Sequence, residues 1–273
     1  MHPTATFPLL ALRCPWWTRR VLSLQRSVTR RHVIMAWTCS GESNTALVEN
    51  MAKNGLITDE RVKDAFVKVD RAHYAPVRPY EDSPQSIGHR ATISAPHMHA
   101  AAVEHMLPYL VPTGTCPRRI LDVGSGSGYL THILAELSGP DSLVVGLEHI
   151  VELRDLGSRN MSRSEDGQRL LAEGRVKFCV GDGRLGWIEA SASSSPDGSN
   201  SWDAIHVGAS AREVHPELIR QLKAPGCMFI PVDDDSYGDS QHVWKIEKDQ
   251  QGQVTQKRLF GVRYVPLTDA PRP

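Results

Sequence analysis

Short apolar runs alternate along the middle of the chain with segments whose apolar residues recur at helical spacing. The runs predict buried strands, and they cover residues 120–123, 143–147, 176–180, 204–207 and 228–231. The intervening segments predict helices at 129–137, from 150 onward and at 213–222. This alternation is typical of an α/β fold with a mostly parallel central sheet and helices on both faces. Two later strand-like runs, 242–246 and 259–265, have no helix between them and predict a C-terminal antiparallel strand pair.

Upstream of these strands the pattern predicts three helices, at residues 44–54, 59–69 and 96–110. Ser43 or Asn44 can cap the first helix, and Gly55 suits the left-handed position that follows its end. Between Arg71 and Pro96 the pattern has no periodicity, and a loop of this length is usually functional or disordered. Polar composition predicts two surface insertions, at 163–174 and 191–201.

Composition narrows the class of protein. The 273 residues contain 31 basic and 31 acidic side chains, and a formal charge of zero argues against a nucleic-acid partner. The five cysteines include no C-x-x-C pair, which argues against a disulfide framework or a zinc site. No apolar run approaches the roughly 20 residues of a membrane span. We therefore expect a cytoplasmic protein that binds neither nucleic acid nor membrane.

Charge is unevenly distributed at the N-terminus. Residues 1–41 contain six arginines and no acidic residue, a composition typical of a mitochondrial transit peptide. The alternatives are a disordered tail or translation from an upstream start codon, since Met35 could itself begin a protein. We therefore divide the chain into a basic extension at 1–34, disordered or targeting, and a single domain at 35–273.

Three glycines, Gly124, Gly126 and Gly128, follow the strand that contains Asp122. A glycine-rich turn between a strand and a helix exposes backbone amides that a ligand can approach closely. In open α/β sheets, ligands bind at the carboxyl ends of the strands. Tyr129 stands where the dinucleotide fingerprint G-x-G-x-x-G requires its third glycine, which weakens the case for a nicotinamide cofactor.

Acidic residues follow the next two strands. Glu148 lies about 20 residues after the glycines, where a carboxylate can accept hydrogen bonds from both hydroxyls of a ribose. Asp182 lies in Gly-Asp-Gly-Arg at 181–184 and could accept a hydrogen bond from an adenine amino group. Together with Asp122, these residues predict binding of S-adenosylmethionine. The alternative is that each carboxylate only caps a helix or a turn.

Five sequence blocks occur in an order that resembles a known family. They are Asp-Ser-Pro-Gln-Ser-Ile-Gly (82–88), Ala-Thr-Ile-Ser-Ala-Pro-His-Met-His-Ala (91–100), Leu-Asp-Val-Gly-Ser-Gly-Ser-Gly (121–128), Val-Gly-Asp-Gly-Arg (180–184) and Asp-Ala-Ile-His-Val-Gly-Ala (203–209). Through these blocks the chain resembles the protein-L-isoaspartate (D-aspartate) O-methyltransferase family from 35–37 to 264–269. It departs from the family in Glu148, where animal relatives usually carry Asp, in Ser210, where Ala is common, and in the length of 191–201.

The resemblance implies a Rossmann-like fold of the S-adenosylmethionine-dependent methyltransferases. It also implies methyl transfer from S-adenosylmethionine to the free carboxylate of isoaspartyl residues, and of D-aspartyl residues as the family name includes, in damaged proteins. The resulting ester closes to a succinimide, which begins repair. The implied partners are isoaspartyl-containing peptides and damaged proteins, met by a monomeric enzyme.

The resemblance and the glycine turn together imply the residues of the site. Ser94 is implied as the catalytic residue. The cofactor is implied to bind at Ala91, Thr92, Ile93, Ser94, His99, Asp122, Gly124, Ser125, Gly126, Glu148, Gly181, Asp182 and Thr268. Within this set, the family assigns the ribose to Glu148, the adenine to Gly181 and Asp182, and closure of the site to Thr268.

The acceptor chemistry needs few special residues. A carboxylate with a pKa of about 4 is already deprotonated at neutral pH, so no general base is required. A neutral hydroxyl such as Ser94 can orient one carboxylate oxygen without holding its charge, although Ser94 could instead cap the helix that begins near Pro96. His97 and His99 would lie about 200° apart on a helix, so we expect no metal there. His206 is expected to be a buried, hydrogen-bonded strand residue.

Two alternatives to a repair methyltransferase are considered. A catalytically silent, S-adenosylmethionine-binding adaptor would keep the fold without the reaction, but the intact block 91–94 argues against it. A nicotinamide-dependent oxidoreductase is disfavoured by Tyr129 and by the lack of residues arranged for hydride transfer.

Overall fold

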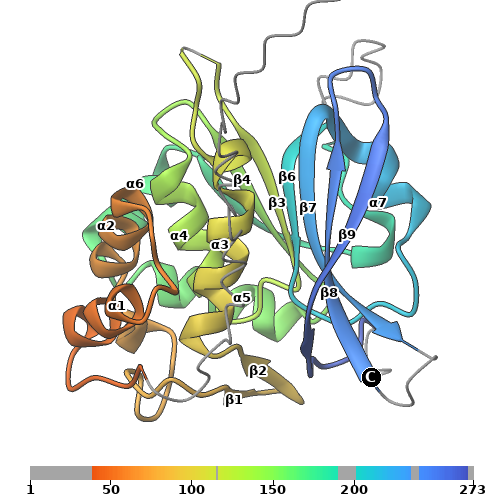
Figure 1. Ribbon diagram of the computed structural model, residues 1–273. Coiled ribbons are helices and arrows are strands. Elements are labelled where there is room, and N and C mark those ends of the chain that lie inside the picture. The colour runs from red at the N-terminus through yellow and green to blue at the C-terminus, as the bar shows by residue number, and fades with distance from the viewer. Residues whose placement is uncertain (1–38, 115, 190–200, 235–239, 270–273) are drawn as a thin grey trace, which may run out of the picture. The chain divides into compact units, whose positions relative to one another are not determined.

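A computed structural model describes residues 39–114, 116–189, 201–234 and 240–269 (Figure 1). The predicted extension 1–34 and nearly all of the predicted insertion 191–201 lie outside the described residues. Among the helices that are described, none is both long and apolar enough to cross a membrane.

The sheet has seven strands in the order β5-β4-β3-β6-β7-β8-β9. Their bounds are Arg119–Val123 for β3, Leu143–Glu148 for β4, Val176–Val180 for β5, Trp202–Val207 for β6, Leu222–Asp234 for β7, Ser240–Lys248 for β8 and Val254–Val262 for β9. The pairs from β5 through β7 are parallel, and β8 and β9 continue the sheet as an antiparallel pair. The predicted α/β fold with a C-terminal antiparallel pair is confirmed.

Several boundaries near the C-terminus differ from the prediction. The strand predicted at 228–231 is β7 and is longer at both ends, Leu222–Asp234. The helix expected at 213–222 is α7, Pro216–Gln221, because Pro216 has the fixed φ that suits a first helical position. The last strand begins at Val254 and ends at Val262, not at 259 and 265. Most side chains of 254–258 are exposed on this edge strand, so no apolar run marks its beginning.

Seven helices surround the sheet in the described part of the chain. They are α1 (Asn44–Lys53), α2 (Glu60–Lys68), α3 (Pro96–Leu110), α4 (Tyr129–Leu137), α5 (Val151–Met161), α6 (Glu165–Ala172) and α7. Local signals account for their ends: the Ser43 side chain accepts from the amide of Ala46, Asp59 accepts from that of Arg61, and Gly55 has a φ of 72°. The predicted helices at 44–54, 59–69, 96–110 and 129–137 are confirmed.

The two faces of the sheet are covered unequally. One face packs Ile120, Val144 and Phe229 against the helices α1 to α4. On the other face, Leu121, Val145 and other alternating strand residues pack against α7. Figure 1 shows α1, α2, α4 and α6 grouped on one side and α7 on the other. The thicker helical layer therefore lies on the face that Asp122 and His206 also point toward.

The aperiodic segment 71–96 is not one long loop. It contains a 3-10 helix, η1 (Arg71–His73), and an antiparallel hairpin of β1 (Gln85–Gly88) and β2 (Ala91–Ile93). Its turn residues His89 and Arg90 have φ angles of 50° and 59°, in the left-handed region that favours Asn and Gly. Strands of four and three residues are too short to show alternation, and His-Arg is not a usual turn sequence. The hairpin was therefore missed.

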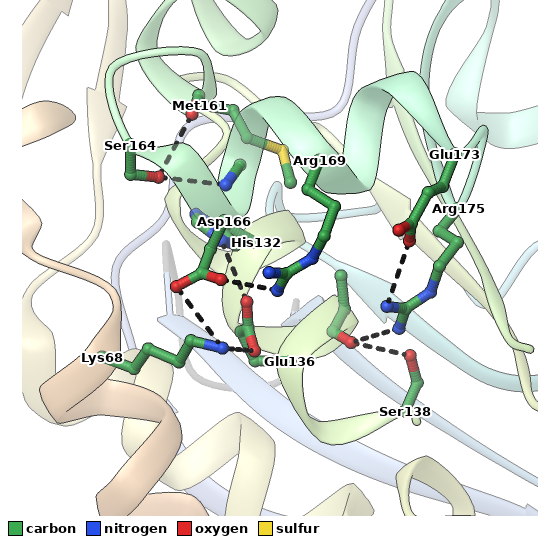
Figure 2. A network of polar contacts seen from close by, with 12 residues as sticks. Lys68, His132, Glu136, Ser138, Met161, Ser164, Asp166, Arg169, Glu173 and Arg175 are labelled. Carbon is green, nitrogen blue, oxygen red and sulfur yellow. Dashed lines mark hydrogen bonds and ion pairs between the residues drawn. The ribbon is translucent and has the colours of Figure 1, made fainter. Parts of the chain in front are cut away.

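The polar segment 163–174, predicted as an insertion, forms the helix α6, which a polar network joins to α2 and α4 (Figure 2). Ser164 caps it by accepting from the amide of Gly167. Lys68 of α2 lies 2.7 Å from Glu136 of α4 and 3.5 Å from Asp166 of α6. Leu170 is the main buried apolar side chain of α6, so this helix is anchored largely by charge.

Candidate active site

A cavity of about 410 Å³ lies at the carboxyl ends of the parallel strands. Its walls come from the ends of β3, β4 and β6, the residues after β5, the β1–β2 turn and the C-terminal segment after β9. The lining residues include Arg90, Thr92, Gly124, Glu148, Gly183, Gly208 and Thr268. This is the position in which open α/β sheets bind ligands.

Glycines form the close walls of this cavity. Gly124 and Gly126 have φ angles of 76° and 50°, which a residue with a side chain adopts only with strain. A Cβ at Gly183 would lie 2.3 Å from Val123 Cγ1, and one at Gly208 would lie 3.1 Å from the carbonyl oxygen of Gly124. Side chains at these positions would therefore collide with the strand ends or deform the turn.

Glu148 is the buried carboxylate of the cavity wall. Its Oε2 accepts a hydrogen bond from the amide of Gly126 at 3.0 Å, and its Oε1 accepts from the amide of His149 at 2.8 Å. The side chain therefore links the glycine turn after β3 to the beginning of α5. Because Oε1 also accepts from the amide of Ile150 at 3.3 Å, Oε2 is the oxygen that retains a lone pair for a ribose hydroxyl.

The C-terminal segment 265–269 lines the cavity opposite the glycine turn. Backbone hydrogen bonds join Ser210 to it on both sides, from Ser210 N to the carbonyl of Val265 at 2.8 Å and from Leu267 N to the carbonyl of Ser210 at 2.7 Å. The carbonyl of Thr268 lies 2.9 Å from His149 Nδ1. Residues far apart in the sequence therefore close this side of the cavity.

Asp182 is placed differently from the other predicted cofactor residues. It does not line the cavity, and its carboxylate pairs with Arg184, at 2.6 Å from Nη2 to Oδ2, and caps η2 (Gly183–Leu185). The hydrogen bond from Arg184 holds the pKa of Asp182 below its ordinary value. Arg184 also pairs with Asp269 of the C-terminal segment. Contact between Asp182 and an adenine stays a prediction, and it would have to share the carboxylate with Arg184.

A small cavity of about 30 Å³ adjoins the first one and contains Ser94. The two cavities share the lining residues Thr92, Gly124, Gly126 and Gly208. Ser94 is half-buried and is not a helix cap, because the N-cap of α3 is Ala95 and no side chain bonds there. Burial raises the pKa of Tyr264, and a hydrogen bond with Ser94 acts in the opposite direction. The Ser94 hydroxyl therefore faces the small cavity and the Tyr264 phenol.

Buried histidines surround the small cavity. Asp122 and His206 are register partners on β3 and β6, and His206 Nδ1 lies 2.8 Å from Asp122 Oδ1. The other oxygen of Asp122 accepts from the Thr131 hydroxyl at 2.6 Å, so this buried carboxylate is fully satisfied. The expectation that His206 is a buried, hydrogen-bonded strand residue is confirmed.

His97 and His99 have separate environments at the start of α3. His97 Nδ1 lies 2.7 Å from the buried carboxylate of Asp82. The ring of His99 packs against Tyr129 at 5.3 Å between centroids. Burial, together with nearby Arg71 and the neighbouring histidines, holds the pKa of His99 well below its ordinary value, so its imidazole is neutral at neutral pH.

The structure brings twelve of the thirteen predicted site residues to the walls of the two cavities, with Asp182 outside them. Their individual roles stay predictions. Sequence reasoning missed several lining residues: His89, Arg90, His149, Ile150, Leu153, Gly183, Gly208, Ala209, Val265, Pro266 and Leu267. Gly183 and Gly208 stood inside quoted blocks and could have been found as glycines beside strand ends. Ala209 also stood inside a quoted block, and His149, Ile150 and Leu153 directly follow the end of β4. The remaining residues depend on how the hairpin and the C-terminal segment fold back.

Comparisons with known proteins agree on one family. The family model described as protein-L-isoaspartate(D-aspartate) O-methyltransferase matches residues 42–272. A protein-L-isoaspartate O-methyltransferase of Caenorhabditis elegans is 41% identical over 234 residues, which cover 86% of this chain and 96% of the relative. One of Triticum aestivum is 43% identical over 229 residues, which cover 83% of this chain and 92% of the relative.

A solved structure from Plasmodium falciparum is also similar. It is of a protein assigned to the protein-L-isoaspartate O-methyltransferases, in complex with S-adenosyl-L-homocysteine, and is 32% identical with a TM-score of 0.73. The similarity covers 84% of this chain and 100% of that one. A second protein-L-isoaspartate O-methyltransferase structure, at 21% identity and a TM-score of 0.64, shares the fold.

Proposed function

Because the chain belongs to the protein-L-isoaspartate(D-aspartate) O-methyltransferase family, we propose that its two adjoining cavities hold a methyl donor and an isoaspartyl carboxylate side by side. The protein is an S-adenosylmethionine-dependent methyltransferase that acts on isoaspartyl residues in damaged proteins. The two cavities share a wall, so Ser94 in the smaller cavity lies beside the glycine-lined larger one. This shared wall is the observation that supports the assignment of the two cavities.

The larger cavity fits S-adenosylmethionine. Its volume of about 410 Å³ suits a cofactor of that size. The missing side chains at Gly124, Gly126 and Gly183 open room that any Cβ would reduce. Glu148 would hold the ribose hydroxyls, while Leu147 and Ile150 offer apolar walls to the adenine. When bound, S-adenosylmethionine supplies an electrophilic methyl group on a positively charged sulfur.

Ser94 would orient the acceptor carboxylate in the smaller cavity. Its hydroxyl is free of a capping role and can donate to one carboxylate oxygen, leaving the other to face the cofactor. His99 is neutral, and both oxygens of Asp122 already accept hydrogen bonds from His206 and Thr131, so neither side chain binds the acceptor carboxylate as a cation would. Orientation in a site sheltered from water is therefore the main contribution of these residues.

Selectivity for isoaspartate follows from the position of the carboxylate. In an isoaspartyl linkage the main chain runs through the side-chain carbonyl, so the free α-carboxylate is one methylene nearer to the main chain than that of a normal aspartate. If the hairpin at 85–93 and the segment 207–210 hold the peptide backbone, only the shorter branch places its oxygen beside Ser94. A misplacement of about 1 Å can lower a rate by roughly a hundredfold.

Further features of the protein belong to the same proposal. We propose that D-aspartyl residues are accepted more weakly, because inversion at the α-carbon redirects the carboxylate. We propose that the enzyme acts as a monomer without a membrane partner; its formal charge of zero supports only the absence of a nucleic-acid partner. A cytoplasmic location is supported by the free thiols of Cys116, Cys179 and Cys227, which suit a reducing compartment.

The testing experiment compares two peptides that differ only in Asp or isoAsp at one position. We expect methylation of the isoAsp peptide at least about a hundredfold faster. In the same assay, Ser94→Ala is expected to lower kcat by about tenfold or more, while the free energy of unfolding changes by less than about 0.5 kcal/mol because no cap is lost. Equal methylation of both peptides would leave only a general carboxyl methyltransferase.

A further inference from the structure

We propose that Arg71 is a positioning residue for the methyl-transfer reaction, acting through Ser94 from beneath the small cavity. The inference rests on the proposed role of Ser94. It concerns a side chain that lines neither cavity and that lies 23 positions before Ser94 in the sequence.

Arg71 is a fully buried cation, with 0% of the residue exposed. Its guanidinium carbon lies 5.1 Å from the centre of the Tyr129 ring, and the fully buried carboxylate of Asp82 attracts it. Burial lowers the pKa of Arg71 only to about 10, so the side chain keeps its charge at neutral pH. Among the described residues, Nε and Nη1 have no acceptor at ordinary hydrogen-bond geometry, although a looser hydrogen bond with Tyr129 helps to keep the pKa of Arg71 high.

One hydrogen bond connects this cation to the site: Arg71 Nη2 donates to the carbonyl oxygen of Ser94 at 2.8 Å. The start of α3 offers Ser94 little other support. Ala95 occupies the N-cap position without a side-chain acceptor, and Pro96 has no amide proton. A charge-assisted bond to the carbonyl restricts the ψ angle of Ser94, and the ψ angle helps set where its hydroxyl points.

Arg71 itself is rigidly held. Its amide donates to Asn44 Oδ1 at 3.3 Å, and its carbonyl accepts from the amides of Tyr74 and Ala75, each at 2.9 Å. Asn44 in turn donates to the carbonyl of Phe66 at the end of α2. The N-terminal helices thereby fix the backbone of Arg71, and the Tyr129 ring and the Ser94 carbonyl contact its guanidinium.

Stability alone does not account for a buried arginine whose one well-formed side-chain hydrogen bond goes to the Ser94 carbonyl. Removing a cation from water is costly, and an apolar side chain of similar length often serves as well in a core. An apolar residue in place of Arg71 could not donate a directional hydrogen bond to the Ser94 carbonyl, so the orientation of that carbonyl would be lost. Arg71 is therefore expected to matter more for turnover than for binding of the cofactor.

The test is a double-mutant cycle in the full chain with Arg71→Met and Ser94→Ala. We expect Arg71→Met to lower kcat by about 10- to 100-fold with less than about a twofold change in the dissociation constant of S-adenosylhomocysteine. In the Ser94→Ala background the same change should lower kcat by less than about twofold, because the positioned hydroxyl is already absent. Arg71→Lys, which keeps the charge but not the planar donor group, should retain part of the activity.

Arg118→Met is the matched control for loss of a partly buried arginine. Arg118 precedes β3 at the amino end of the sheet and pairs with Asp203 at 3.1 Å. Its loss should lower the melting temperature and leave kcat unchanged at temperatures where the protein stays folded. If Arg71→Met does not fold, Arg71→Lys enters the same cycle.

Three outcomes separate the possible failures. Full, independent losses of kcat from Arg71 and Ser94 changes would overturn the positioning role alone. Equal losses of kcat and cofactor affinity in Arg71→Met would do the same. Wild-type turnover in Ser94→Ala would instead overturn the proposed function of Ser94 on which the inference depends.

Discussion

At the scale of single residues, the backbone of Gly183 lies close to the end of β3, and this close approach helps to shape the cavity. An alanine Cβ there would lie 2.3 Å from Val123 Cγ1, and Val123 is buried in the sheet with little freedom to move. We expect Gly183→Ala to lower the free energy of unfolding by about 1–3 kcal/mol and to weaken cofactor binding. Thermal unfolding and titration with S-adenosylhomocysteine measure both effects.

Gly261→Ala on β9 is the matched control for this substitution. Its nearest neighbouring atom would lie 3.8 Å from the new Cβ, which is ordinary contact. The change should therefore alter stability by less than about 0.5 kcal/mol and leave cofactor binding intact. Similar melting temperatures for the two alanine variants would contradict the proposed role of Gly183 as a wall of the cavity.

At the scale of helices and strands, the polar network of Figure 2 should make the attachment of α6 and α2 to α4 sensitive to acid. Burial alone would raise the pKa of Glu136, but hydrogen bonds from His132 and Lys68 outweigh it and place the pKa at about 2. A carboxylate whose pKa is lower in the folded state stabilises the protein at pH values above its unfolded pKa of 4.5. This stabilisation is lost as the pH falls toward 2.

We therefore expect Glu136→Gln to be less stable than the wild type by about 1 kcal/mol at pH 7, allowing for solvent screening of a partly exposed group. The difference should shrink as the pH falls from about 5 to 2, because the wild-type carboxylate becomes protonated there. Urea denaturation of both proteins across this range measures it. A difference that stays constant with pH would mean that the charge of Glu136 does not hold these helices together.

At the scale of the whole molecule, residues 39–41 contact the folded domain. Cys39 is fully buried, the carbonyl of Ser40 accepts from Asn50 Nδ2 at 2.9 Å, and the amide of Gly41 donates to the carbonyl of Tyr80 at 3.0 Å. A chain that begins at Met35 keeps all of these contacts and should keep full kcat and stability. A chain that begins at Glu42 loses them and should have a lower melting temperature.

The role of residues 1–34 is tested separately, by fusing them to a fluorescent protein. A mitochondrial signal would support the targeting interpretation, and a diffuse cytosolic signal would exclude it. Loss of activity in the chain that begins at Met35 would contradict the division of the chain at that position.

The sequence alone determined the features that depend on neighbouring residues. Helices α3 and α4 were predicted with their observed bounds, because apolar residues recur at helical spacing and Pro96 suits a first turn. The strand ends at Asp122 and Glu148 were predicted from apolar runs, and the glycine turn between strand and helix indicated a cofactor site. Such features need only the local physics of chain conformation.

Tertiary structure decided which distant residues meet. Arg71 lies beneath Ser94 because η1 and the β1–β2 hairpin fold against the start of α3, and Asp122 meets His206 because β3 and β6 are neighbours in the sheet. Arg184, which also pairs with the neighbouring Asp182, meets Asp269 of the C-terminal segment, 85 positions away in the sequence. The segment 265–269 closes the cavity only by pairing with Ser210. These contacts depend on strand order and on chain segments returning over long separations, and no local pattern of side chains encodes either.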